Sequence, residues 1–138
     1  MENVAELMKH IEDNLLKLNF NKNTIAFKIK DFCLTHYKYA PTFNKVHVVV
    51  HTWVHPWDDA KIIYLDTVRK FLIDDLFELM CKLQLKYVHE AQQFEQSDEE
   101  TYEKFRMKIK KIDEICVALQ NGDIFRAFVN EYSNGYLN

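Results

Sequence analysis

Three histidines at four-residue spacing are the side chains best suited to chemistry. His47, His51 and His55 precede Asp58 and Asp59, and imidazole with carboxylate is the ligand set of zinc hydrolases. On an extended chain, positions four apart are separated by about 13 Å, too far to share an ion bound at roughly 2 Å. On a helix they would be about 6 Å apart and could chelate. Because the valines between them favour an extended chain, we predict no metal or other cofactor. A hydrolase site at residues 51–58 is the weakest of three hypotheses.

The same stretch is rich in aromatic side chains. If residues 45–55 are extended, their backbone groups need a partner, either residues 24–30 or another chain. The two tryptophans either close one end of the fold or form an exposed patch. We expect binding of a protein partner, or self-association as a homodimer. The residues assigned to this surface are Phe43, His47, His51, Trp53, His55 and Trp57.

A basic row supplies the second hypothesis. Lys104, Lys108 and Lys111 share one helical face, as a phosphate-binding surface requires. Acidic residues at 98–100 and 103 weaken that field, and such rows are most often solvated helix faces. Nucleic-acid binding is therefore the second choice.

Motifs of enzymes are absent from the sequence. We find no GxSxG, no HExxH, no phosphate-binding glycine loop and no kinase motif. The adjacent carboxylates Asp74 and Asp75 diverge on a helix and do not make an acid–base couple. The interpretation therefore leans towards a protein that is not an enzyme.

Helices must position the candidate site residues. The sequence predicts the longest helix over residues 60–95. Neither Gly nor Pro occurs between Asp58 and Gln96. Apolar residues recur at steps of three and four, which predicts one buried stripe. Each large side chain buried there would contribute about 1.5–3 kcal/mol. The stripe consists of Leu65, Val68, Leu72, Leu76, Leu79, Leu83 and Tyr87.

A second long helix is predicted over residues 98–121. Ser97 and Glu100 have capping-box spacing, and Asn121-Gly122 is a typical left-handed end. Between them runs an apolar seam of Tyr102, Phe105, Ile109, Ile112, Cys116 and Leu119. Because only a short polar turn joins the two helices, we predict an antiparallel hairpin.

Shorter segments complete a mainly α, single-domain bundle over 1–138. Residues 3–18 predict a helix with a buried stripe that extends to Leu18. Residues 24–38 fit a helix better than a strand, with Asn23 or Thr24 as the cap. A last helix begins at Asp123 and ends at 133–135. The expected fold has about five helices and one short extended segment near 45–55.

Composition limits the function further. The net charge of −3 gives no overall attraction to nucleic acid. No apolar run approaches the roughly 20 residues of a membrane span, and the first residues lack the blocks of a signal peptide. Cys33, Cys81 and Cys116 are widely separated, which favours free thiols in a reducing compartment. We predict a small intracellular interaction protein, and the Asn-, Lys- and Ile-rich composition suggests a viral or mobile-element origin.

Overall fold

The computed structural model describes residues 2–36, 65, 66 and 68–136, and within them every regular element is helical. The elements are α1 (Glu2–Asn14), α2 (Lys22–His36), η1 (Phe71–Leu76), α5 (Phe77–Phe94), α6 (Glu99–Gln120) and α7 (Asp123–Tyr136). With η1 and α5 taken as one continuous helix, the described residues form five helices and no strand. This confirms the mainly α bundle. The predicted extended segment at 45–55 lies outside the described residues.

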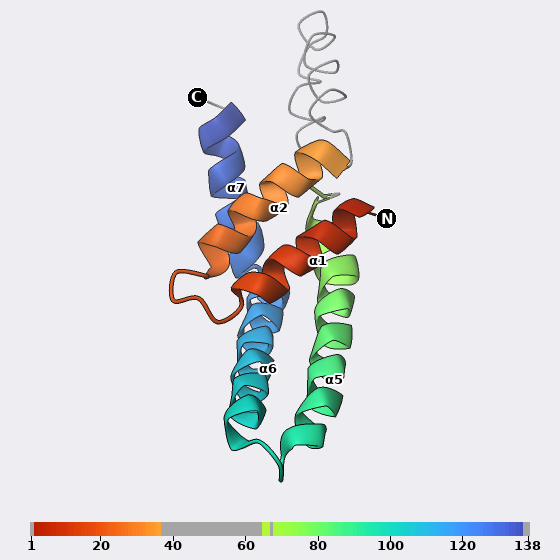
Figure 1. The fold of residues 1–138 in the computed structure, drawn as a ribbon. Helices are drawn as coiled ribbons and strands as arrows, with labels where there is room; N and C mark the ends of the chain where they lie inside the picture. Colours follow the sequence, from red (N-terminus) through yellow and green to blue (C-terminus); the bar gives the residue numbers. More distant parts are fainter. Residues whose placement is uncertain (1, 37–64, 67, 137–138) are drawn as a thin grey trace, which may run out of the picture.

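The bundle is built on the antiparallel hairpin of α5 and α6 (Figure 1). Met80 and Leu83 of α5 are buried, as are Ile112 and Leu119 of α6. Leu83, Ile112 and Leu119 come from the stripe and the seam that the sequence pattern predicts, and Met80 lies beside the predicted stripe. The hairpin prediction is confirmed for the described part of 60–95.

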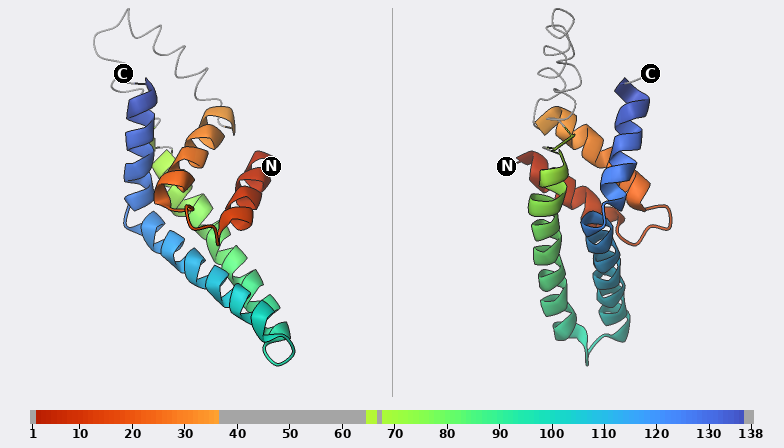
Figure 2. Two further views of the ribbon diagram at one scale, coloured as in Figure 1. Left: turned by 60° about the vertical axis from the view of Figure 1, so that its left-hand side comes forward. Right: turned by 180° about the vertical axis from the view of Figure 1, so that it is seen from behind.

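The remaining helices gather at one end of the hairpin. In Figure 1, α1 and α2 cross in front of its upper part, and α7 continues from α6 beside α2. Seen from behind in Figure 2, the lower parts of α5 and α6 extend beyond the other described helices. The hairpin is thus an arm that projects from a small helical body.

One hydrophobic core joins all five helices. It contains Leu7 and Ile11 from α1, Ile25 and Ile29 from α2, and Phe128 from α7, packed with the hairpin residues. Among the described side chains no polar or charged residue is buried. Hydrophobic burial is therefore the main force that holds the helices together.

A π-helical turn interrupts the helical pattern just before α5. The Phe77 N–H donates to the Leu72 carbonyl, five residues back. The wider turn keeps Phe71, Leu72 and Leu76 all buried, and the Phe71 ring stacks on Phe32 of α2 at 5.1 Å. The long helix predicted over 60–95 thus departs from the regular α-helical period here, where Phe71 packs against α2.

The first two helices differ from prediction at their ends. α1 stops at Asn14, whose side-chain amide donates to the His10 carbonyl at 2.7 Å. Leu18 therefore lies beyond the helix and is fully exposed, so its assignment to the buried stripe is wrong. α2 is a helix as predicted, but its cap is Asn21 and not Asn23 or Thr24. The Asn21 Oδ1 atom accepts from the backbone N–H groups of both those residues, at 2.9 and 3.2 Å.

The cap of α6 is Asp98 rather than Ser97. Asp98 Oδ1 accepts from the Thr101 N–H at 3.1 Å, whereas Ser97 Oγ donates to the Gln93 carbonyl at 3.3 Å. At the other end, Gly122 has the predicted left-handed conformation, with φ of 84°. α7 begins at Asp123 as predicted and continues to Tyr136, past the predicted end at 133–135.

Candidate partner-binding hollow

The predicted partner surface, Phe43, His47, His51, Trp53, His55 and Trp57, lies outside the described residues, as does Asp58 of the metal hypothesis. In the described ranges, no three His, Cys, Asp or Glu side chains gather as a metal ion would need. None of the helices in that part of the chain is both long and apolar enough to cross a membrane. The candidate site below is therefore built from other side chains.

The basic row of α6 is engaged in contacts within the chain. Lys104 forms an ion pair with Glu100 at 3.7 Å. The Lys108 ammonium lies 5.2 Å from the ring centre of Tyr87 and 5.5 Å from that of Phe105. Both are cation–π distances. These two lysines thus have partners inside the hairpin, which weakens the proposed phosphate-binding row.

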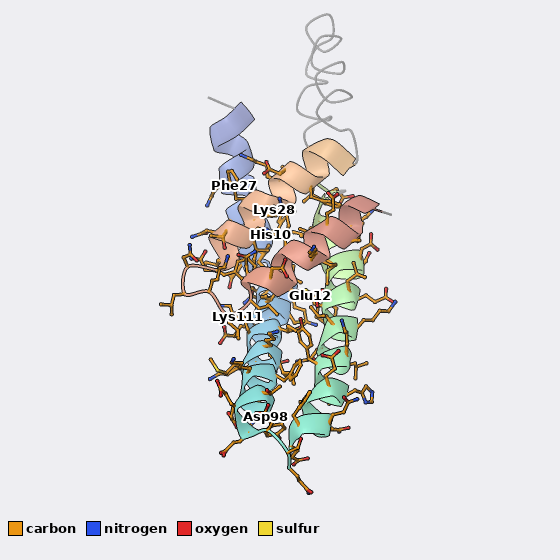
Figure 3. All side chains as sticks on the ribbon, viewed as in Figure 1. His10, Glu12, Phe27, Lys28, Asp98 and Lys111 are labelled. Atoms are coloured by element: carbon orange, nitrogen blue, oxygen red, sulfur yellow. The ribbon has the colours of Figure 1, made fainter. Side chains whose placement is uncertain are left out.

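Lys111, the third lysine of that row, lies beside the connection between α1 and α2 (Figure 3). Its ammonium is 3.6 Å from Glu114, and this ion pair borders two adjoining hollows. The larger, of about 350 Å³, is here called the Leu18 hollow. It is lined by Leu15, Leu16, Lys17, Leu18, Met107, Lys110, Lys111 and Glu114.

The second hollow continues the surface towards α2 and α7. It has a volume of about 290 Å³ and is lined by Asn21, Lys22, Ile25, Lys111, Glu114, Ile115, Ala118 and Ile124. Together the two hollows bring lysines from the α1–α2 connection, from α2 and from α6 onto one surface.

The α1–α2 connection holds Leu16 and Leu18 outward. Leu15 and Phe20 anchor it, because both are buried in the core. Between them, the Lys17 N–H donates to the Asn14 carbonyl at 3.0 Å and the Phe20 N–H donates to the Lys17 carbonyl at 3.0 Å. The connection is thus tied at both ends, and its two remaining leucines are presented to solvent by the backbone that these bonds fix.

Exposed apolar groups and positive charge coincide at the Leu18 hollow. Leu16 is 41% exposed, Met107 is 56% exposed and Leu18 is fully exposed. The two hollows carry four lysines, Lys17, Lys22, Lys110 and Lys111, and one acid, Glu114, although the whole chain has a net charge of −3. An apolar floor with a basic rim is suited to an amphipathic, acidic ligand.

Sequence reasoning missed this site. Its helical period placed Leu18 in the core, and Met107 received no role. The available signal was Leu16-Lys17-Leu18 itself, in which apolar residues flank a lysine just after a helix that Asn14 can end.

No protein family, no curated protein and no solved structure matches the chain. What the chain does must therefore follow from its own side chains.

Proposed function

We propose that this chain is a non-enzymatic interaction protein that binds an acidic, amphipathic segment of a partner protein in the Leu18 hollow. The observation that supports the proposal is the exposure of Leu16, Leu18 and Met107 around one hollow with lysines at its edge. Large apolar side chains are exposed to water in the free chain. A ligand that covers them stabilises the complex by about 25 cal/mol per Å² of apolar surface buried.

The shape of the surface favours a helical ligand. The hollow lies between α6 and the α1–α2 connection, and an amphipathic helix laid along such a surface buries residues at i, i+3, i+4 and i+7. Lys17 and Lys110 would face acidic side chains on the flanks of that helix. These exposed charges would mainly raise the association rate and select the partner, since solvated ion pairs add little affinity.

The predicted surface around Phe43–Trp57 stays a prediction and would be a second contact area. Intracellular location and a viral or mobile-element origin also remain predictions. Self-association is the alternative in which a second copy supplies the ligand. Nucleic-acid binding through Lys104, Lys108 and Lys111 is the other alternative, and it would not need the leucines.

A designed peptide tests the proposal. The probe is a labelled, 18-residue peptide with leucines at helical spacing on one face and glutamates on the other, and fluorescence anisotropy measures its binding. We expect Leu18→Ser and Met107→Ser each to weaken binding by roughly tenfold, because each removes about 1–2 kcal/mol of apolar burial. The matched control is Leu85→Ser, since Leu85 is 60% exposed on α5 and lines neither hollow.

Two further arms separate the alternatives. Charge reversal of Lys17 and Lys110 to Glu should slow association with the peptide, and added salt should do the same. Binding of a labelled single-stranded DNA that falls when Lys104, Lys108 and Lys111 are changed to Glu, but not in Leu18→Ser, would favour the nucleic-acid hypothesis. Equal peptide affinity for the native chain, Leu18→Ser and Met107→Ser would contradict the proposal. Light scattering on the unliganded protein tests self-association.

A further inference from the structure

Two cysteines that are distant in the sequence face each other across the hairpin. Cys81 of α5 and Cys116 of α6 are both free and both partly exposed, and the Cys81 thiol is near enough to help raise the pKa of Cys116. Sequence reasoning treated the cysteines as separate because 34 positions of chain lie between them. The fold brings these two thiols near each other across the hairpin.

The register of the hairpin places these two residues opposite each other. One turn nearer the hairpin tip, the Gln84 side-chain amide donates to the Asp113 carboxylate and, at 3.4 Å, to the Ile109 carbonyl. Cys81 lies three residues before Gln84, and Cys116 lies three residues after Asp113. Because the helices are antiparallel, these equal steps lead to the same level of the interface. Nearer the tip of the hairpin, the centres of the Phe94 and Phe105 rings are 6.0 Å apart and the rings stack. This contact also holds α5 against α6.

We propose that Cys81 and Cys116 form an oxidisable pair that closes to an intrachain disulfide and covalently joins α5 to α6. The oxidant would be a low-molecular-weight disulfide such as oxidised glutathione. This modification is independent of the Leu18 hollow and of any partner that binds there.

The reaction consists of two thiol–disulfide exchanges. One protein thiolate attacks the small disulfide, forms a mixed disulfide and releases one small thiolate. The second protein thiolate then attacks the protein sulfur of the mixed disulfide, which closes the Cys81–Cys116 bond and releases the second small thiolate. The two electrons of the dithiol reduce the small disulfide, and the two thiol protons end on the two released thiols.

The surroundings of the two cysteines affect how fast the disulfide can form. Burial, followed by the neighbouring Cys81 thiol, raises the pKa of Cys116 to about 11. Asp113 contributes in the same direction. Since the thiolate is the attacking species, attack by the Cys116 sulfur at neutral pH is slow. Both residues are partly exposed, which leaves access for a small disulfide. An oxidising compartment or an oxidative episode would close the bond, and reduction would reopen it.

Oxidation of the full, folded chain tests this proposal. The protein is incubated at pH 8.5 with oxidised glutathione, alkylated and digested without reduction, and the linked peptides are identified by mass spectrometry. We expect one dominant product, a monomer lighter by two hydrogen atoms with residues 81 and 116 linked. Its Tm should rise by about 10 °C relative to the reduced chain, as a disulfide across a long loop gives, and reduction should reverse the shift.

Matched variants make the test specific. Cys33→Ser, which alters the cysteine in α2, should keep both the linked product and the rise in Tm, whereas Cys81→Ser and Cys116→Ser should each lose both. In denaturant, where the hairpin is absent, the native chain should instead give a mixture of pairings. Mixed disulfides alone, links to Cys33, or intermolecular links as the dominant product of the folded native chain would overturn the proposal.

Discussion

The phenol of Tyr87 on α5 donates a 2.8 Å hydrogen bond to Glu12 Oε1 on α1, 75 positions away along the chain. Tyr87 is buried and Glu12 lies partly in solvent, and Figure 3 shows Glu12 on the side of α1 that faces α5. This bond ties the first helix, and with it the α1–α2 connection, to the hairpin. The bond therefore adds to the hydrophobic contacts of α1 and Leu15 that hold the Leu18 hollow in place.

The contribution of this bond is measurable. Tyr87→Phe removes the donor and retains the ring, so we expect the free energy of unfolding to fall by about 1 kcal/mol. Urea denaturation measures the change. The control is Tyr102→Phe, whose ring lies beside Arg106 on α6 and away from the α1 contact. Equal effects of the two substitutions would show that the Glu12 bond has no special role.

Alkaline pH tests the same contact in a second way. Burial, and then the bond to Glu12, raises the pKa of Tyr87 well above its ordinary value. The unfolded tyrosine loses its proton near pH 10, so the free energy of unfolding should decrease as the pH rises above about 10. In Tyr87→Phe this decrease should be smaller. An identical alkaline profile for the native chain and the variant would contradict the assignment.

Mild acid should act through His10. Burial, followed by Lys28 and Lys17, lowers the pKa of this imidazole, against an opposing effect of Asp13. The unfolded state therefore binds more protons around the ordinary pKa of about 6.5, and the free energy of unfolding should fall as pH falls from about 7.5 to 5.5. His10→Gln should flatten this slope while the other histidines remain as an unchanged background. Parallel slopes for the two proteins would exclude His10 as the cause.

The start of α6 distinguishes two capping schemes. Asp98→Ala removes the acceptor of the Thr101 N–H and of the Thr101 hydroxyl, and loss of such a cap should lower Tm by roughly 3–5 °C. Ser97→Ala should leave Tm nearly unchanged. Thermal unfolding followed by circular dichroism measures both. A larger effect at Ser97 would restore the capping box that the sequence predicted.

Gly122 has a conformational role between α6 and α7. Its φ of 84° suits glycine, and a Cβ there would meet Arg126 Nη1 at 3.2 Å. That atom ends a flexible side chain and can move, so the main cost of Gly122→Ala is backbone strain, about 1 kcal/mol. Arg126→Ala should therefore fail to rescue the variant in chemical denaturation. Full rescue would indicate that the side-chain contact, and not φ, is the cause.

Long-range packing of the hairpin could be predicted from sequence because its signals agree. The stripe through Leu76 and Leu83, the seam through Ile112 and Leu119, and the glycine at 122 all favour the same pair of helices. The π turn could not be predicted, since it depends on Phe71 meeting Phe32 from another helix. The apolar period also extended the first predicted helix to Leu18, beyond its observed end at Asn14. Periodicity alone does not show where a helix ends.

The candidate sites were less accessible to sequence reasoning. The position of Cys81 opposite Cys116 follows from the hairpin register, which can be estimated only once the turn at Ser97-Asp98 is accepted as its centre. The Leu18 hollow needs the α1–α2 connection to lie against Met107 and Lys110 of α6, and no local pattern predicts that meeting. The row of Lys104, Lys108 and Lys111 was correctly placed on one face, but its partners Glu100, Tyr87 and Glu114 were not foreseen.

The most direct test of the proposed binding surface is a methyl NMR titration of the native chain with the acidic amphipathic peptide. We predict saturable shifts of the Leu16, Leu18 and Met107 methyl groups, and no shift of the Leu85 methyl groups. Shifts confined to other methyl groups, or equal shifts at Leu85 and Leu18, would contradict the assignment of the Leu18 hollow as the binding site.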